Sequence, residues 1–270
     1  MLEINDVKKT FHSGTPNEVR ALQGVSLSLK RGSFVCVIGT NGSGKSTLLN
    51  AVAGTFLVDS GRIQLDGTDL TRWPEHRRAK LIGRVFQDPF SGTAPSMTIA
   101  ENLALAARRG QRRGLNWALS PGRRGKLRDQ VAAMGLDLEE RLNNPIGTLS
   151  GGQRQSLTLL MAGLMKPSLL LLDEHTAALD PKSADQVIRL TQEFISRDHL
   201  TTLMVTHSMQ QAAFLGDRVI MMDRGQIAFD ISGQAKRRVR PEDLLSRFED
   251  LRRANQLDES AAEMLRMQYV

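Results

Sequence analysis

The sequence has one cysteine, few aromatic residues and no long apolar stretch. Phe, Trp and Tyr make up 4% of its 270 residues, and Cys36 is the only cysteine. The lone cysteine excludes an internal disulfide, and its place in a predicted buried strand indicates a core residue rather than a nucleophile. No segment approaches the roughly 20 apolar residues of a membrane-spanning helix, and the N-terminus lacks the basic start and apolar block of a signal peptide. We therefore expect a cytoplasmic protein.

Positive charge exceeds negative charge, with a net charge of +7 at pH 7 and a pI near 10.0. Such a balance suits nucleic acid or an anionic membrane surface. Much of the excess lies in residues 108–128 and 236–240. Few aromatic residues lie between these cations, which argues against a stacking platform for single-stranded nucleic acid. We expect no nucleic-acid partner, whereas a solvated basic face and a surface near anionic lipid head groups both fit the pattern.

A glycine-rich loop carries a lysine and follows a short apolar, β-branched run. Gly39, Gly44, Lys45 and Ser46 fit the pattern Gly-x-x-x-x-Gly-Lys-Ser/Thr, between a predicted strand at 33–38 and a predicted helix that starts at Ser46. Glycines let successive N–H groups turn inward, the lysine places a positive charge on the β- and γ-phosphates, and the serine hydroxyl suits Mg²⁺. The loop thus predicts a nucleoside triphosphate site. Its candidate ligands are Asn41, Gly42, Ser43, Gly44, Lys45, Ser46 and Thr47.

A second phosphate-site element follows a run of four leucines. Residues 169–172 predict a strand that is buried on both faces, as parallel sheets require. Asp173 ends this strand, at the edge where open α/β sheets bind ligands, and its carboxylate can hold the Mg²⁺ shell. Glu174, one residue further on, is placed to polarise an attacking water.

The order of the motifs resembles that of the ATP-binding-cassette (ABC) ATPases over roughly residues 1–232. The signature sequence Leu-Ser-Gly-Gly-Gln is highly specific to that family, whereas many NTPases share the phosphate loop. Five elements similar to the family's Q-loop, signature, acidic pair, D-loop and switch histidine follow the phosphate loop. They are Gln87, Leu149–Gln153, Asp173 with Glu174, Asp180 and His207.

The resemblance implies a role for each matched residue. Gln87 would contact Mg²⁺ and the attacking water, and His207 would contact the γ-phosphate and hold the catalytic geometry. The alternative for Gln87 is a plain surface glutamine, and outside this motif order a lone histidine such as His207 is more often structural. Phe11 resembles the aromatic residue that stacks on adenine, and a core aromatic of the first sheet also fits. The signature would bind the γ-phosphate of an ATP held mainly by a second copy, through Ser150, Gly151, Gly152 and Gln153.

The pattern predicts an α/β fold with a P-loop NTPase core, an antiparallel β subdomain and an inserted helical subdomain. Residues 1–240 form the nucleotide-binding domain, with the helical subdomain at about 88–165, and 241–270 form a C-terminal helical appendage. Residues 114–125, rich in Gly, Pro and Arg, predict a loop. His175 stands where the family commonly has proline, which should alter the rigidity of the turn without changing the chemistry.

The resemblance also implies transport. In this family the helical subdomain and the Q-loop dock on short helices of membrane permease subunits, and ATP binding closes a homodimer. We expect a peripheral subunit at the cytoplasmic face of the inner membrane that powers import of a small solute such as an amino acid. An extracytoplasmic solute-binding protein would belong to the same system. Two alternatives also fit: a soluble ATPase of iron–sulfur assembly, and a subunit of a lipid or drug exporter.

Overall fold

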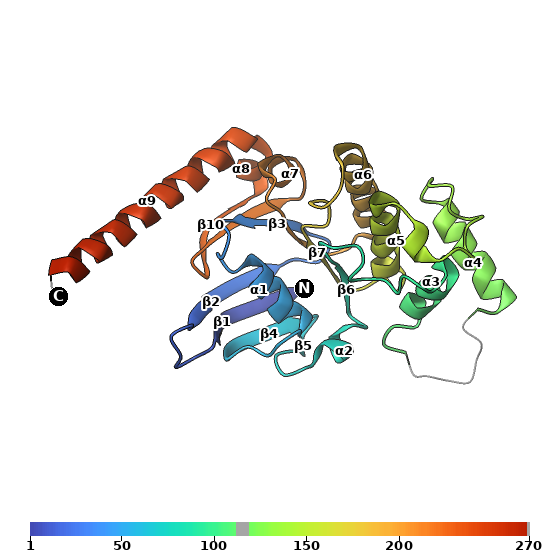
Figure 1. The fold of residues 1–270 in the computed structure, drawn as a ribbon, viewed down its shortest axis with the longest axis horizontal. Helices are drawn as coiled ribbons and strands as arrows, with labels where there is room; N and C mark the ends of the chain where they lie inside the picture. Colours follow the sequence, from blue (N-terminus) through green and yellow to red (C-terminus); the bar gives the residue numbers. More distant parts are fainter. Residues whose placement is uncertain (112–118, 269–270) are drawn as a thin grey trace.

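The computed structural model describes residues 1–111 and 119–268, with side chains as far as residue 254. Two β-sheets and a set of helices make up the molecule (Figure 1). The smaller sheet is antiparallel, with the strand order β2-β1-β4-β5. Its strands are β1 (Leu2–Phe11), β2 (Val19–Leu29), β4 (Ser60–Leu65) and β5 (Thr68–Asp69).

The larger sheet has the strand order β10-β9-β3-β8-β7-β6. Its strands run parallel except for β10, which pairs antiparallel with β9 at one edge. Parallel neighbours need crossover connections, and helices supply most of them. The strands are β3 (Phe34–Gly39), β6 (Ile82–Val85), β7 (Leu169–Asp173), β8 (Thr202–Val205), β9 (Arg218–Asp223) and β10 (Gln226–Ser232).

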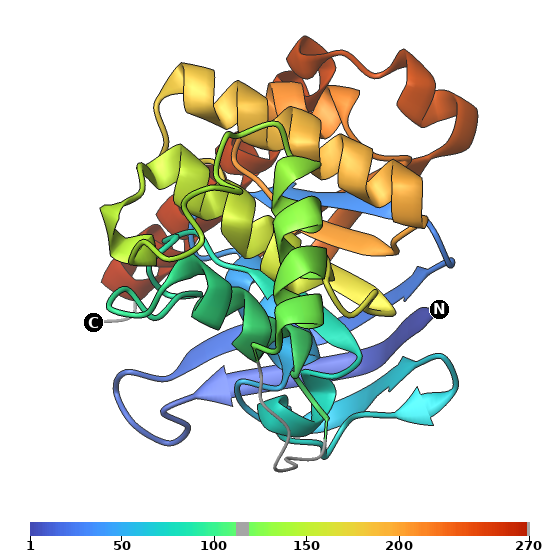
Figure 2. The same cartoon turned by 90° about the vertical axis from the view of Figure 1, so that its right-hand side faces the viewer.

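Helices cover the larger sheet on both faces, in keeping with its parallel strands. The helix α1 lies between the two sheets (Figure 1), and α5 and α6 lie on the opposite face of the larger sheet (Figure 2). The helices are α1 (Lys45–Ala53), α2 (Glu75–Arg78), α3 (Ile99–Ala107), α4 (Pro121–Ala132), α5 (Gly151–Gly163), α6 (Pro181–Asp198), α7 (Met209–Phe214), α8 (Gly233–Arg238) and α9 (Pro241–Gln268), with a 3₁₀ turn at Ile146–Thr148.

Each face of the larger sheet belongs to its own hydrophobic core. Val35 and Leu171 point to the core shared with α1 and the smaller sheet. Their chain neighbours Cys36 and Leu170 point to the other core, shared with α5 and α6. Alternate residues of a strand thus supply both cores, which explains why β3 and the leucine run are continuously apolar. The predicted α/β core with an antiparallel β layer and inserted helices is confirmed.

Side-chain caps define the starts of two helices. Thr98 and Glu101 make a capping box at α3: the Glu101 N–H donates to Thr98 Oγ1 (3.2 Å), and the Thr98 N–H donates to Glu101 Oε2 (2.7 Å). Asp180 caps α6, where its Oδ1 accepts from the Ser183 N–H at 3.1 Å. Each cap satisfies backbone donors that the first helical turn leaves free.

The loop predicted at residues 114–125 is wrong in its second part. Residues 112–118 lie outside the described residues, but α4 begins at Pro121. A proline suits the first helical position, since its ring fixes φ and its missing N–H is not needed there. Leu127 and Val131 are buried in the core and hold the helix in place. Packing therefore outweighs the unfavourable helix propensity of the two glycines in this segment.

The C-terminal helix α9 begins at the residue where we expect an appendage. Leu244 is buried, and Phe248 and Leu251 pack against the hydrophobic core that also includes α5 and α6. The later turns of α9 extend away from both sheets (Figure 1). The division of the chain after residue 240 stays a prediction. Within the described residues, no helix combines the length and the apolar character needed to cross a membrane.

Arg78 supports the helix that follows the phosphate loop, and its substitution tests this part of the fold. Its guanidinium is buried and donates to the carbonyl oxygens of Ala51 (2.8 Å), Val52 (2.9 Å) and Trp73 (2.8 Å). Burial lowers the pKa of this guanidinium to about 10. We expect Arg78→Met to lower the free energy of unfolding by about 2–3 kcal/mol, because buried carbonyl groups lose their partners.

The measurement is urea unfolding at pH 7, with Arg62→Met as the control. Arg62 pairs with Asp69 at 2.8 Å on an exposed surface. Exposed pairs contribute at most about 1 kcal/mol, so this control should change stability much less. Equal losses in the two variants would contradict the role of Arg78.

Candidate functional site

The phosphate loop connects the carboxyl end of β3 to the N-terminus of α1, as predicted. Gly42 has φ 76° and Gly44 has φ 98°, in the region that favours glycine. A Cβ atom on Gly44 would lie 2.5 Å from the carbonyl oxygen of Ala21 on β2. The loop therefore needs glycine both for its turn and for its close contact with the smaller sheet.

Lys45 is buried beneath this loop. Its Nζ donates to the carbonyl oxygens of Gly39 (3.0 Å) and Thr40 (2.8 Å). Burial lowers the pKa of the ammonium, and the carboxylates of Glu174 and Asp173 act in the opposite direction. The cation thus lies within electrostatic reach of the two acidic residues that the sequence analysis singles out.

Three neighbouring parallel strands end at one edge of the sheet, and each leads to a predicted site residue. Gln87 lies two residues beyond β6, Asp173 ends β7, and His207 lies two residues beyond β8. The strands are adjacent, in the order β8-β7-β6, with β3 beside β8. The structure therefore brings these residues together beside the phosphate loop.

Glu174 and His207 are in direct contact. Glu174 Oε1 lies 2.6 Å from His207 Nε2, and the glutamate side chain is 11% exposed against 47% for the histidine. The backbone of Glu174 has φ 45°, and its N–H donates to the Val205 carbonyl oxygen at 3.0 Å. A carboxylate and an imidazole are thus held where either group can exchange a proton with a water molecule.

Side chains beyond the motifs fix the segment after Glu174. Thr206 Oγ1 donates to Gln211 Oε1 (2.7 Å), and Gln211 Nε2 donates to Thr176 Oγ1 (3.1 Å). His175 is buried, with its Nε2 3.1 Å from Thr191 Oγ1 on α6, and burial lowers its pKa to about 4. The histidine that replaces the common proline therefore links this turn to α6 as a neutral side chain at pH 7.

The signature residues form the start of α5. Ser150 is the N-cap: its Oγ accepts from the Gln153 N–H (3.2 Å), and its own N–H donates to Gln153 Oε1 (3.3 Å). Ser150 and Gly151 are exposed, whereas Gly152 is buried beside Ser183 of α6. A Cβ atom at Gly152 would lie 2.7 Å from the Ser183 Cβ, so glycine lets the two helix starts meet.

The phosphate loop and the signature lie in different parts of the chain's fold. The phosphate loop leads into α1 between the sheets, whereas α5 packs with α3, α6 and β6 (Figure 1). A helix N-terminus carries partial positive charge and free N–H groups, so both places suit anions. One copy therefore offers two separate surfaces that suit anions.

Phe11 lies at the end of β1 and is half-buried. Its ring meets Phe56 edge to face with centroids 5.2 Å apart, and Lys9 Nζ lies 5.5 Å from the centroid of each ring. Among the described residues, Phe11 belongs to neither hydrophobic core. The interpretation of Phe11 as a core aromatic thus loses support, and stacking on adenine stays a prediction.

Two arginines next to the motifs make contacts that the sequence does not predict. Arg84, three residues before the Q-loop glutamine, has Nη2 3.4 Å from Asp173 Oδ2. Arg154, directly after the signature, donates to the Gly147 carbonyl oxygen (2.8 Å) and stacks 3.7 Å from the Phe90 ring centroid. Their only sequence signal is proximity to a motif.

The residues at this edge fit Mg²⁺ and a nucleotide. Ser46, Gln87 and Asp173 offer a hydroxyl, an amide and a carboxylate, the hard oxygen donors that Mg²⁺ prefers. In the described part of the chain, no three His, Cys, Asp or Glu side chains cluster to hold a metal alone. Proteins bind Mg²⁺ through one or two carboxylates together with substrate phosphates, and Asp173 and a bound nucleotide would supply such a set. Ser43 Oγ in the loop is buried and has no hydrogen-bond partner among the described residues.

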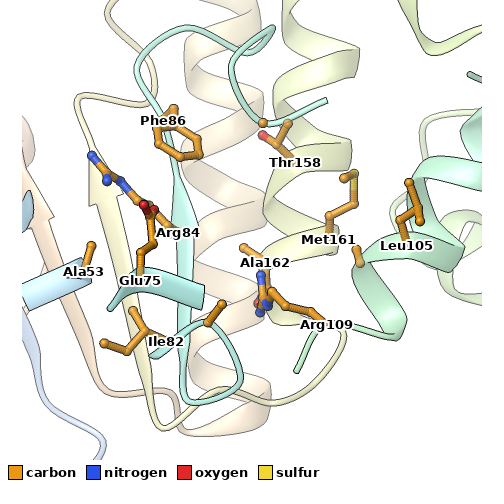
Figure 3. A pocket seen from close by; sticks show the side chains of 13 residues that line it. Ala53, Glu75, Ile82, Arg84, Phe86, Leu105, Arg109, Thr158, Met161 and Ala162 are labelled. Atoms are coloured by element: carbon orange, nitrogen blue, oxygen red, sulfur yellow. The ribbon is translucent and has the colours of Figure 1, made fainter. Parts of the chain in front are cut away.

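A mostly apolar groove of about 340 Å³ lies between the larger sheet and the inserted helices (Figure 3). Phe86, which directly precedes the Q-loop glutamine, forms part of its wall. Leu105, on the helical side, is 57% exposed. The groove is also lined by Arg84, Arg109, Met161 and Ala162.

Comparisons with known proteins agree with this geometry. Residues 22–177 match a family model described as ABC transporter. The chain is 43% identical over 251 residues to a tyrosine transport ATP-binding protein of Clostridioides difficile, covering 92% of this chain and 99% of that protein. It is 34% identical to the lipoprotein-releasing system ATP-binding protein LolD 1 of Caulobacter vibrioides, covering 83% and 93%.

Solved structures give the same result. A dimeric post-hydrolysis state of the ATP-binding cassette MJ0796, bound to ADP and Pi, has a TM-score of 0.73 and 29% identity, covering 86% of this chain and 98% of that one. The structure of cbiO1 from Clostridium perfringens has the same fold, with a TM-score of 0.72, 24% identity and 98% of each chain covered. The chain therefore belongs to the ABC transporter family, as an ATP-binding subunit that hydrolyses ATP.

Proposed function

We propose that this subunit dimerises on ATP and drives import of a small solute through a separate membrane permease. The observation that carries the proposal is the presence, in one chain, of a phosphate loop with its carboxylates and of a second anion-binding helix start at Ser150. Neither surface encloses a phosphate alone, but two copies arranged head to tail would bury two ATP molecules. Enclosure excludes water and strengthens the electrostatic interactions within the site.

In the proposed reaction Glu174 accepts the proton of the attacking water, and His207 orients that carboxylate from 2.6 Å while it contacts the γ-phosphate. Lys45 and the loop amides hold the β- and γ-phosphates. Mg²⁺, held by Ser46, Gln87 and Asp173 with the phosphates, would neutralise charge on the transferred group. The signature of the second copy, Ser150 to Gln153, supplies a hydroxyl and helix N–H groups to the same γ-phosphate.

The groove is the proposed docking surface for the permease. Its floor is apolar, one wall carries the exposed Leu105, and the opposite wall leads into Gln87 through Phe86. A short amphipathic permease helix in this groove would therefore contact the inserted helices and the Q-loop at once. Movement between these two walls is the proposed route by which ATP binding reaches the permease.

Import of an amino acid is supported by the relative named for tyrosine transport, which this chain matches over 92% of its length. An aromatic amino acid is therefore the proposed solute, delivered by an extracytoplasmic solute-binding protein. A site at the cytoplasmic face of the inner membrane follows from docking on a permease. The relatives named for transport weigh against a soluble ATPase of iron–sulfur assembly, and the lipoprotein-releasing relative keeps the exporter alternative open to the test below.

Glu174→Gln tests the proposed base. We expect ATP binding to persist and turnover to fall by about a hundredfold or more, because the amide cannot accept the proton of the attacking water. The ATP-bound dimer should then accumulate, which light scattering can measure. Glu193→Gln, an exposed change on α6, is the control. Turnover at the unaltered rate in Glu174→Gln would rule out this base.

Ser150→Arg tests completion of the site by a second copy. We expect each subunit to bind ATP with nearly unchanged affinity while hydrolysis and ATP-driven dimerisation are lost, because the arginine blocks the surface that faces the partner's phosphate. Thr98→Arg removes the matching capping box at α3 and controls for loss of a cap. Loss of ATP binding in the isolated Ser150→Arg subunit would instead mean that Ser150 acts within its own copy.

Purification of the tagged subunit from detergent-solubilised native membranes tests the transport proposal. We expect a multi-span permease to co-purify, and a Leu105→Asp variant with a charge in the groove to recover much less of it. A solute-binding protein encoded or purified with that permease would support import and give the solute to assay. Recovery of soluble partners only, with an empty membrane fraction, would favour the non-transport alternative.

A further inference from the structure

Arg84 makes an unusual set of contacts for a residue on a β-strand. Its Nη2 donates to Asn50 Oδ1 (2.6 Å) and lies 3.4 Å from Asp173 Oδ2, and its Nη1 donates to Thr55 Oγ1 (3.1 Å). Asn50 lies on α1, whose first turn carries Lys45 and belongs to the phosphate loop. One guanidinium thus joins the phosphate-loop helix to the carboxylate proposed for Mg²⁺.

This guanidinium is largely removed from water. The Arg84 side chain is 13% exposed and that of Asp173 is 15% exposed. Arg84 Nε is buried without a hydrogen-bond partner among the described residues, and the guanidinium stacks 4.4 Å from the Phe86 ring centroid. A buried charge with an unsatisfied donor costs stability, which makes a purely stabilising role for Arg84 a poor explanation.

The other side of Arg84 forms a wall of the docking groove. Figure 3 shows Arg84 and Phe86 on the strand side of this pocket, across from Met161 and Leu105 on the inserted helices. A partner helix seated there would press on Phe86 and, through that ring, on the guanidinium stacked against it. The side chain that stacks on Phe86 therefore also holds Asp173.

We propose that Arg84 is a positioning residue that orients Asp173 toward Mg²⁺ and transmits occupancy of the groove to that carboxylate. This inference rests on the proposed function of the Asp173 site and of the groove. The physical basis is that Arg84 engages one carboxylate oxygen, which fixes the rotamer of Asp173 and directs the other oxygen toward the metal. Partners that orient a ligating side chain affect metal affinity strongly even without contacting the metal.

The first test measures the Mg²⁺ concentration at half-maximal binding of a fluorescent ATP analogue to the full chain. Each variant is made in the Glu174→Gln background, so that hydrolysis does not intervene. We expect Arg84→Met to raise this midpoint about tenfold, as for other partners of metal ligands. Arg84→Lys should raise it less, because its ammonium can still donate to an oxygen of Asp173, although it loses the fork that reaches Asn50 and Thr55.

Arg197→Met is a matched control on α6. Arg197 also pairs with an aspartate, Asp198 (2.8 Å), and stacks 4.6 Å from the ring centroid of Phe194, but it lies away from the phosphate site. We expect its Mg²⁺ midpoint to match that of the Glu174→Gln parent. Thermal unfolding of each variant establishes that the chain is folded.

The direction of the shift separates two effects. Loss of a positive charge alone would favour Mg²⁺ and lower the midpoint, whereas loss of orientation raises it. A lower or unchanged midpoint in folded Arg84→Met, or an equal rise in Arg197→Met, overturns the positioning role. Binding of ATP that needs no Mg²⁺ in the parent would instead refute the proposed metal site itself.

The second test fills the groove covalently. Leu105→Cys places an exposed thiol in it, and the native Cys36 should not compete, because it is buried and burial raises its pKa to about 12. We expect a bulky fluorescein maleimide on residue 105 to shift the Mg²⁺ midpoint at least threefold when Arg84 is present, and much less in Arg84→Met. If the label leaves the Mg²⁺ midpoint unchanged when Arg84 is present, Arg84 does not transmit occupancy of the groove to Asp173. Equal shifts of the midpoint with Arg84 and with Arg84→Met would overturn that role as well.

Discussion

A parallel sheet is stable only when both of its faces are covered, and this constraint determines where the candidate site can lie. In this chain the helices and the smaller sheet cover both faces, so the carboxyl edge of the strands is where polar side chains find room. The phosphate loop, Gln87, Asp173 and His207 all follow strands that end at that edge. The candidate site residues therefore lie at the edge of the sheet that the packed helices leave uncovered.

Much of this arrangement was predictable because each motif carries its own structural context. The β-branched run before the phosphate loop, the four leucines before Asp173 and the capping pair Thr98 and Glu101 each specify an element by local rules. Loop composition was a poorer guide from Ser120 on. A serine and a proline start α4 there, and Leu127 and Val131 anchor it through contacts that no local pattern reveals.

The contacts between motifs were less accessible to sequence reasoning. Arg84, Arg154 and Gln211 carry no motif, yet they contact Asp173, the turn before the signature and the threonine next to His207. Arg84 and Asp173 lie 89 residues apart, so spacing along the chain gives no signal for their contact. His175 shows the same limit: the departure from proline was visible, but its contact with Thr191 depends on where α6 lies.

The backbone of Glu174 has a consequence for evolution of the chain. A left-handed conformation at a residue with a side chain costs about 1–2 kcal/mol, and here the hydrogen bond to Val205 holds it in place. A glycine or asparagine would adopt this conformation with less strain, so the residue that is most stable at this position is not the proposed catalytic base. Selection for stability alone would remove the carboxylate, and its presence is what the proposed role of Glu174 predicts for a trade-off between activity and stability.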